Sequence, residues 1–162
     1  MQGKLCTAFF KFPPGQGPAR KEATAVKLTV ASLLLQPYMN GTRLLAGKKG
    51  LSHPVECISF AEVPSAPHNL LKNTLLLTDA SFFDLRDQDA LARTFAFCQT
   101  AKVSALGLKL PNGAEPPEDF LRRAEQAALP VLALPADVIL SSVISGVSYE
   151  IFYRNGYNLY HS

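Results

Sequence analysis

Short apolar segments, each bounded by turn-forming residues, recur along the middle of the chain. Some are continuous apolar runs, such as Leu75-Leu76-Leu77, rather than an alternation of apolar and polar positions. Continuous runs suit strands that are buried on both faces, as in a parallel sheet covered by helices. The segments predicted as strands are Arg43–Ala46, Val55–Ala61, Thr74–Thr78, Ser104–Lys109 and Pro130–Leu134.

Helical patterns precede these segments and alternate with the later ones. Thr29 is placed to cap a short helix that reaches Gln36 and stops at Pro37, because proline cannot continue a helix interior. Two further helices are predicted from apolar residues at helical spacing: Leu91, Phe95 and Cys98, then Phe120, Leu121, Ala124 and Ala128. Acids and prolines suited to a helix start lie near their beginnings: Asp84, Asp87 and Asp89, then Pro116, Pro117, Glu118 and Asp119.

A last helix is expected to begin with Asp137 as its cap. Its apolar face would carry Leu140, Val143, Ile144, Val147 and Ile151, and aromatic residues crowd its end: Tyr149, Phe152, Tyr153, Tyr157 and Tyr160. An apolar surface of this size is expected to be buried against another surface. It packs back on its own domain, or it meets a partner subunit or a following domain, and the sequence leaves both open. In the second case the predicted dimerisation residues are Val143, Ile144, Val147 and Ile151.

Strands that alternate with helices predict βαβ units with right-handed crossovers. The expected fold class is α/β, with three layers, a mostly parallel sheet of about five strands flanked by helices, and a C-terminal linker helix. The expected organisation is a flexible leader at 1–25, which is rich in proline and glycine, an α/β domain at 26–136, and a C-terminal helix with an aromatic tail at 137–162.

Composition places the chain among ordinary globular proteins. It has 162 residues, of which 48% are hydrophobic and 18% are charged. No apolar run approaches the roughly 20 residues that a membrane-spanning helix needs. The net charge of +3 comes from scattered lysines and arginines without the clustered basic stripe of a nucleic-acid-binding domain. Cys6, Cys57 and Cys98 are widely spaced and odd in number, which favours reduced thiols and a cytoplasmic location.

Motifs of known catalytic chemistry are missing from the sequence. His53, His68 and His161 lie far apart and outside any HExxH pattern, so neither a metal site nor a cofactor is expected. No serine lies in a GxSxG motif. The glycines and lysines of residues 47–50 lack the rest of a phosphate-binding loop and indicate a turn. The chain is therefore not expected to be an enzyme.

Polar residues follow three of the predicted strands at their carboxyl ends. Glu62 follows the second strand, Thr78 and Asp79 the third, and Lys109 the fourth. In open α/β sheets small ligands bind beyond the carboxyl ends of the strands. These four residues are therefore the predicted ligand-binding residues. The alternative is that the acids are loop caps and the lysine a solvated edge residue.

Several segments carry a family resemblance. Residues 43–55 read RLLAGKKGLSHPV, which fits the pattern LxAGxxGLxxPV, and 60–64 form a predicted strand ending in a glutamate. The supporting pieces are Leu28–Leu34, Leu70–Asp79, Ala105–Leu110 and Leu129–Pro135. In order and spacing, over about residues 28–150, they resemble the N-terminal domain of PucR-type (purine catabolism) transcription regulators.

This resemblance implies a sensor domain that receives a signal for transcription regulation. Its ligand would be a small metabolite, such as a purine-degradation product or a related nitrogen compound, and it would act as a homodimer. DNA would be bound only through a C-terminal helix-turn-helix domain that this chain does not contain. The alternative is a protein-interaction or dimerisation module without a small ligand. The chain departs from the family's glycines at Lys72-Asn73-Thr74 and Asp79-Ala80, so a ligand other than a purine product is also open.

Overall fold

The computed structural model describes residues 27–61, 70–79, 88–111 and 114–161, and the leader expected at 1–25 lies outside them. The described elements, in chain order, are α2 (Val30–Leu34), η2 (Pro37–Met39), β1 (Arg43–Ala46), η3 (Lys48–Gly50), β2 (Cys57–Ala61), β3 (Thr74–Asp79), α3 (Gln88–Ala101), β4 (Ala105–Lys109), α4 (Glu118–Gln126), β5 (Val131–Leu134) and α5 (Leu140–His161).

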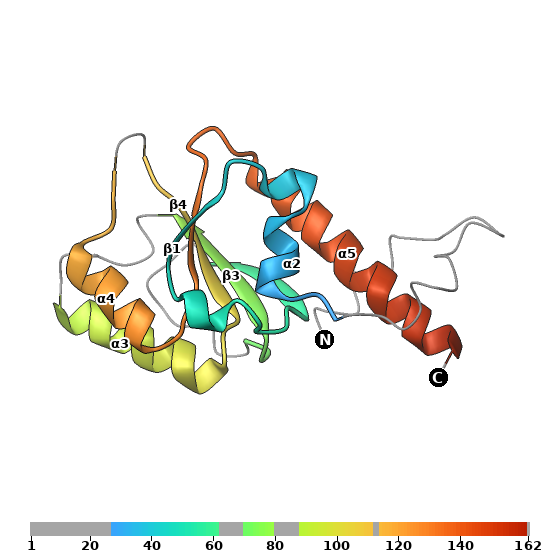
Figure 1. Cartoon of the computed structure of the whole chain (residues 1–162), viewed down its shortest axis with the longest axis horizontal. Coiled ribbons are helices and arrows are strands. Elements are labelled where there is room, and N and C mark those ends of the chain that lie inside the picture. The colour runs from blue at the N-terminus through green and yellow to red at the C-terminus, as the bar shows by residue number, and fades with distance from the viewer. Residues whose placement is uncertain (1–26, 62–69, 80–87, 112–113, 162) are drawn as a thin grey trace.

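The strands form one five-stranded sheet in the order β1-β5-β4-β3-β2 (Figure 1). β2, β3, β4 and β5 are parallel neighbours in chain order, and β1 joins β5 antiparallel at one edge. The predicted α/β fold with a mostly parallel sheet of five strands is therefore confirmed. Because all four parallel strands run the same way, their carboxyl ends share one edge of the sheet and their amino ends share the other.

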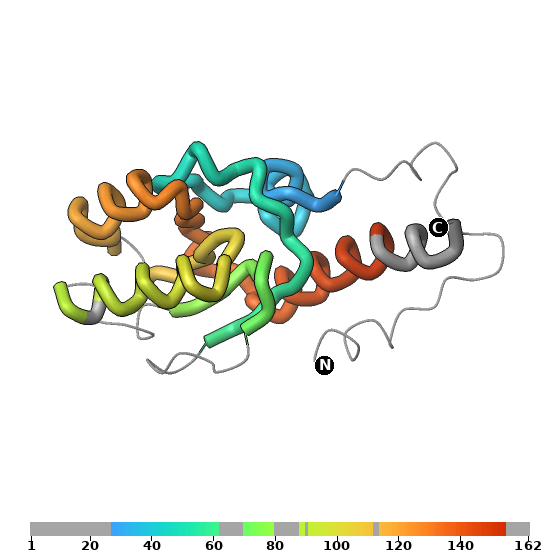
Figure 2. Tube along the Cα trace, turned by 90° about the horizontal axis from the view of Figure 1, so that it is seen from below, coloured from blue at the N-terminus to red at the C-terminus, as the bar shows by residue number. Residues whose placement is uncertain are grey.

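The two faces of the sheet are buried by different helices. Alternate residues of a strand point to opposite faces. In β3, Leu76 belongs to the core cluster that also holds residues of α3 and α4, whereas Leu75 and Leu77 belong to the cluster with residues of α2 and α5. Figure 1 shows these two pairs of helices on opposite sides of the sheet, and Figure 2 shows α3 and α4 side by side. The three predicted layers are thus present.

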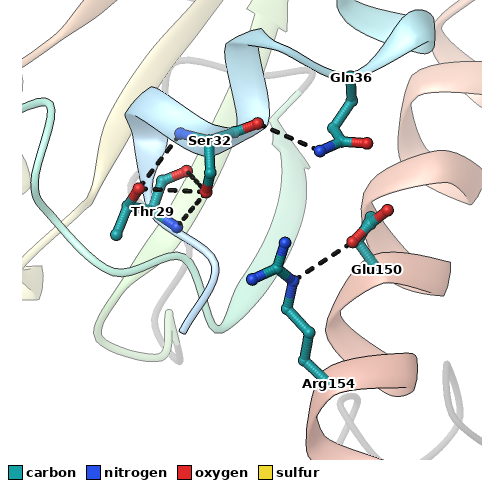
Figure 3. Close-up of polar contacts among 5 residues, drawn as sticks. All are labelled: Thr29, Ser32, Gln36, Glu150 and Arg154. Carbon is teal, nitrogen blue, oxygen red and sulfur yellow. Dashed lines mark hydrogen bonds and ion pairs between the residues drawn. The ribbon is translucent and has the colours of Figure 1, made fainter. Parts of the chain in front are cut away.

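The first helix is shorter than predicted but starts where expected. Thr29 is its N-cap, and a capping box joins its side chain and backbone N–H to Ser32 at 3.2 and 2.9 Å (Figure 3). The helix ends at Leu34 instead of Gln36. Pro37 restricts the residue before it to extended backbone, and Gln36 has φ −78° and ψ 147°.

Two other predicted helix boundaries are corrected by the structure. Asp137 does not cap α5, because the carbonyl of Ile139 accepts the first helical hydrogen bonds, from the amides of Ser142 and Val143. Asp137 lies instead in the turn closed by the bond from the amide of Val138 to the carbonyl of Pro135, at 3.0 Å. Ala128 lies beyond the end of α4, in left-handed backbone with φ 52°.

The apolar face of α5 covers the sheet of its own domain. Val143 and Val147 are fully buried in the cluster that includes Leu75 and Leu132 of the strands. Ile144 and Ile151 are partly buried against the same cluster. Of the predicted dimerisation residues, Val143 and Val147 are therefore buried inside the domain, whereas Ile144 and Ile151 keep part of their side chains exposed. Their role in a homodimer stays a prediction.

Gly146 lets α5 approach the η2 segment closely. A Cβ atom at this position would lie 2.4 Å from Cδ1 of Tyr38, so the aromatic ring rests directly on the helix backbone. Burial, and next the carboxylate of Glu150, raise the pKa of Tyr38, although Arg154 opposes them. Figure 3 shows the ion pair of Glu150 and Arg154 on α5. None of the helices in the described ranges combines the length and apolar character that crossing a membrane requires.

Candidate functional site

The carboxyl edge of the sheet brings together residues that are distant in sequence. Asp79, at the end of β3, is the register partner of Lys109, at the end of β4. Thr78 is paired with Leu108 one position earlier. Three of the four predicted ligand-binding residues are therefore neighbours at this edge. Glu62, the fourth, lies outside the described residues.

Thr78 contributes to the edge from inside. Its side chain is fully buried, and its hydroxyl lies within donor distance of the carbonyls of Ala61, at 3.2 Å, and Asp79, at 3.1 Å. The hydroxyl thus bonds to the end of the neighbouring strand or to its own. Thr78 holds the edge together, while Asp79 and Lys109 are partly exposed to solvent.

Lys109 connects the edge to α5. Its ammonium group donates a hydrogen bond of 3.0 Å to the carbonyl of Val138, in the turn that leads from β5 into α5. Hydrogen bonds from charged donors are the stronger ones in proteins. The end of β4 and the start of α5 are therefore joined through a group at the edge where ligands of α/β sheets bind.

Side chains that could act as nucleophiles or metal ligands are scattered through the part of the chain that the structure describes. It holds no cluster of three or more His, Cys, Asp or Glu side chains that could bind a metal ion. Burial raises the pKa of the Cys98 thiol to about 12, which makes it unreactive at neutral pH. His53 Nδ1 contacts the carbonyl of Ser104 at 3.2 Å, whereas the Ser104 hydroxyl donates to the carbonyl of Pro54. These two residues therefore do not form a nucleophile–base pair.

A pocket of about 390 Å³ lies at the opposite, amino edge of the sheet, where the sequence predicted no site. The turns before β3, β4 and β5 supply much of its wall. It is lined by His53, Pro54, Asn73, Cys98, Gln99, Lys102, Val103, Ser104, Ala127, Ala128 and Leu129. Sequence reasoning missed it because it looked only beyond the carboxyl ends of the strands.

The fold and its edges define the class: an α/β domain with a helix-covered, mostly parallel sheet, a charged carboxyl edge and a long C-terminal helix tied to that edge. Comparison with family models then gives a match to the Purine catabolism regulatory protein-like family (PucR) over residues 32–151. The match spans well over half of the chain, so the chain belongs to this family. A search of curated proteins finds no match.

Family membership confirms the resemblance seen in the sequence and makes this a domain associated with regulators of transcription. The matched range begins within α2 and ends within α5, so it includes all five strands and every described helix at least in part. It therefore covers both edges of the sheet.

Proposed function

We propose that the chain is the signal-input domain of a PucR-type transcription regulator and binds a small nitrogen-rich metabolite at the carboxyl edge of its sheet. The binding residues would be Glu62, Asp79 and Lys109, with Thr78 holding the edge from within. A purine-degradation product or a related nitrogen compound is the proposed ligand class. DNA would be bound by a separate helix-turn-helix domain of the regulator.

The hydrogen bond between Lys109 and Val138 is the observation that carries this proposal. A ligand with a carboxylate or carbonyl oxygen competes with the Val138 carbonyl for the ammonium group. Asp79, the register partner of Lys109, accepts N–H groups from the same ligand. The ligand is thus bound by an acceptor and a donor on adjacent strands.

Release of the Val138 carbonyl changes the start of α5. The helix is packed against the sheet through Val143 and Val147, so its first turn moves with the turn at 135–138 or loses order there. A ligand shifts such an equilibrium only by its differential affinity for the two states. The two states differ in the partner of Lys109: its ammonium group bonds to the Val138 carbonyl in one and is available to the ligand in the other. The ligand therefore binds more tightly to the state in which the bond to Val138 is broken. The signal then passes along α5.

A thermal-shift screen with allantoin, allantoate, xanthine and urate tests the proposal. We expect at least one compound to raise Tm, and the increase to disappear in Asp79→Asn and Lys109→Met. The matched control is Lys49→Met, which removes an exposed lysine of η3 and should keep the increase. A compound that stabilises all three variants equally, or no stabilisation by any compound, contradicts ligand binding at this edge.

Hydrogen exchange measured with the stabilising compound tests the coupling to α5. We expect faster exchange of the amides of Ser142 and Val143, which bond to the carbonyl of Ile139 next to the released turn. Amides near the middle of β4 serve as the internal control and should not change. Unchanged exchange at the start of α5 in the bound state would separate binding from signalling and refute the proposed route.

A protein-interaction module is the second candidate function, and the exposed aromatic side of α5 supports it. Tyr149 is 40% exposed, and its ring lies 6.0 Å from that of Tyr153. Homodimerisation would use this side rather than the buried valines. Sedimentation of the chain and of Tyr149→Asp tests it: a dimer that dissociates in the variant supports an interaction surface here.

A further inference from the structure

Three turns with an unusual backbone line the amino-edge pocket. Asn73, Lys102 and Ala128 are the non-glycine residues with positive φ in the described chain, at 60°, 53° and 52°, and all three line the pocket. Each lies within three residues of the strand that follows it. The three turns therefore converge at the amino ends of β3, β4 and β5.

Two of these turns end helices in the same way. In the turn after α3, the amide of Val103 bonds to the carbonyl of Cys98, and that of Lys102 to Gln99. After α4, the amide of Leu129 bonds to Ala124, and that of Ala128 to Glu125. Both are Schellman motifs, in which the left-handed position is usually glycine. Here the left-handed positions are occupied by Lys102 and Ala128, which line the pocket. Positive φ costs free energy in residues other than glycine.

Two of the residues that line the pocket, His53 and Asn73, can each supply a hydrogen-bond acceptor. The Ser104 carbonyl can only accept, so its contact with His53 Nδ1 requires the hydrogen on Nδ1 and leaves Nε2 of the neutral ring as an acceptor. The amide nitrogen of Asn73 donates to Glu56, which leaves the amide oxygen as an acceptor. The carboxyl ends of α3 and α4 add partial negative charge.

Lys102 adds a positive charge to the lining of the pocket. It is the one lysine or arginine among the lining residues of the described chain, and no carboxylate is among them. Apolar surface from Pro54, Val103 and Leu129 completes the wall. The volume lies near the lower end of the roughly 300–1,000 Å³ of small-molecule sites.

We infer that the amino-edge pocket binds a small zwitterionic amino carboxylate, with its ammonium group on the acceptors at His53, Asn73 and the helix ends, and its carboxylate on Lys102. This goes beyond the proposed function, because it places a second ligand at the opposite edge of the same strands. An aliphatic side chain of the ligand packs on the apolar wall.

NMR titration of the full chain tests this inference with L-alanine, L-proline and L-leucine as probes. We expect at least one of them to shift the backbone amide signals of Asn73, Lys102 and Ala128. Propanoate lacks the ammonium group and L-alaninamide lacks the carboxylate, so each should bind at least tenfold more weakly than the parent amino acid. Equal binding of either analogue, or no shift with any probe at millimolar concentration, overturns the inference.

Variants of Lys102 separate a binding role from a structural one. Lys102→Met and Lys102→Gly should weaken amino-acid binding by roughly ten- to a hundredfold, the loss expected when a charged hydrogen-bond partner is removed. Lys102→Gly relieves the left-handed backbone and should raise Tm, so its loss of binding does not come from unfolding. Lys49→Met is the matched control and should bind normally. Full binding by both Lys102 variants refutes the site.

The same titration distinguishes this inference from the proposed function. Shifts confined to Asp79 and Lys109 would place amino-acid binding at the carboxyl edge and overturn the amino-edge site, while leaving the proposed sensor intact. Shifts at the amino edge that persist in Asp79→Asn and Lys109→Met support two independent sites.

Discussion

The two edges of the sheet are built differently although the same four parallel strands end at both. At the carboxyl edge, charged side chains end adjacent strands, and Lys109 bonds to the turn before α5. At the amino edge, backbone turns with positive φ line a pocket next to the ends of α3 and α4. Under the two proposals, a ligand at the first edge would act on α5, and a ligand at the second would act on the helices of the other layer.

The two edges also differ in how they are connected to α5. α5 and α2 cover one face of the sheet, and α3 and α4 cover the other. Only the carboxyl edge has a described side-chain bond to the start of α5.

Phe120→Ala should weaken the packing between α3 and α4, the two helices whose carboxyl ends lie at the amino edge. Phe120 is fully buried, and its ring centroid lies 5.4 Å from that of Phe95, so it joins α4 to α3. Truncation of a buried phenylalanine costs about 3–5 kcal/mol of unfolding free energy. Urea denaturation measures the loss. A cost below about 1 kcal/mol would mean that the two helices do not depend on this contact.

Gly146→Ala tests the packing of the other layer. The new methyl group meets the ring of Tyr38, and overpacking of this kind costs about 1–3 kcal/mol. In a Tyr38→Ala background the clash is absent, and alanine is favoured over glycine in a helix by about 1 kcal/mol. The sign of the effect should therefore reverse in the double variant. Denaturation of the four proteins of this cycle measures it, and equal effects in both backgrounds contradict the contact.

Lys109→Met should loosen α5 while leaving the amino edge unchanged. Removal of the bond to Val138 is expected to cost about 1–2 kcal/mol, since the donor is charged but partly exposed. Hydrogen exchange should rise at Ser142 and Val143 and stay constant at Lys102 and Ala128. A uniform increase over the whole chain would show that the two edges are not independent.

Ionisation of Cys98, a residue that lines the amino-edge pocket, should make the stability of the protein depend on pH. Burial raises the thiol pKa from 9.0 to about 12, so between these values the unfolded chain loses a proton that the folded chain keeps. Stability therefore falls as pH rises through this range, by about 1 kcal/mol per pH unit. Cys98→Ala should flatten the pH dependence measured by urea denaturation. An unchanged slope would mean that other groups cause it.

Glycine at the left-handed positions of the amino edge should stabilise the fold by the smallest amount. Lys102→Gly and Ala128→Gly each relieve positive φ, which is worth about 1 kcal/mol. The matched control is Ala127→Gly, where φ is −82° and glycine brings no relief. Thermal unfolding compares the three variants. Equal or lower Tm for the first two would show that their side chains contribute more to folding than the backbone costs.

Much of the carboxyl edge could be predicted, because regular parallel strands determine it. Thr78, Asp79 and Lys109 end buried apolar runs, and strand ends in a parallel sheet meet at one edge. The amino edge could not be predicted in the same way. Lys102 and Ala128 follow helical stripes without the glycine that normally marks a left-handed helix end, so nothing local indicated their backbone.

Hydrophobic spacing and capping chemistry are local properties, so the amino-acid pattern predicts the order and type of the elements, the cap at Thr29 and the mostly parallel sheet. The surface that the apolar face of α5 covers and the position of the pocket depend on how these elements pack in three dimensions. Periodicity shows that a face must be buried but does not specify its partner, and the sheet of the same chain supplies it through contacts with Leu75 and Leu132. The pocket depends on three turns that are far apart in sequence and meet only when their strands pair.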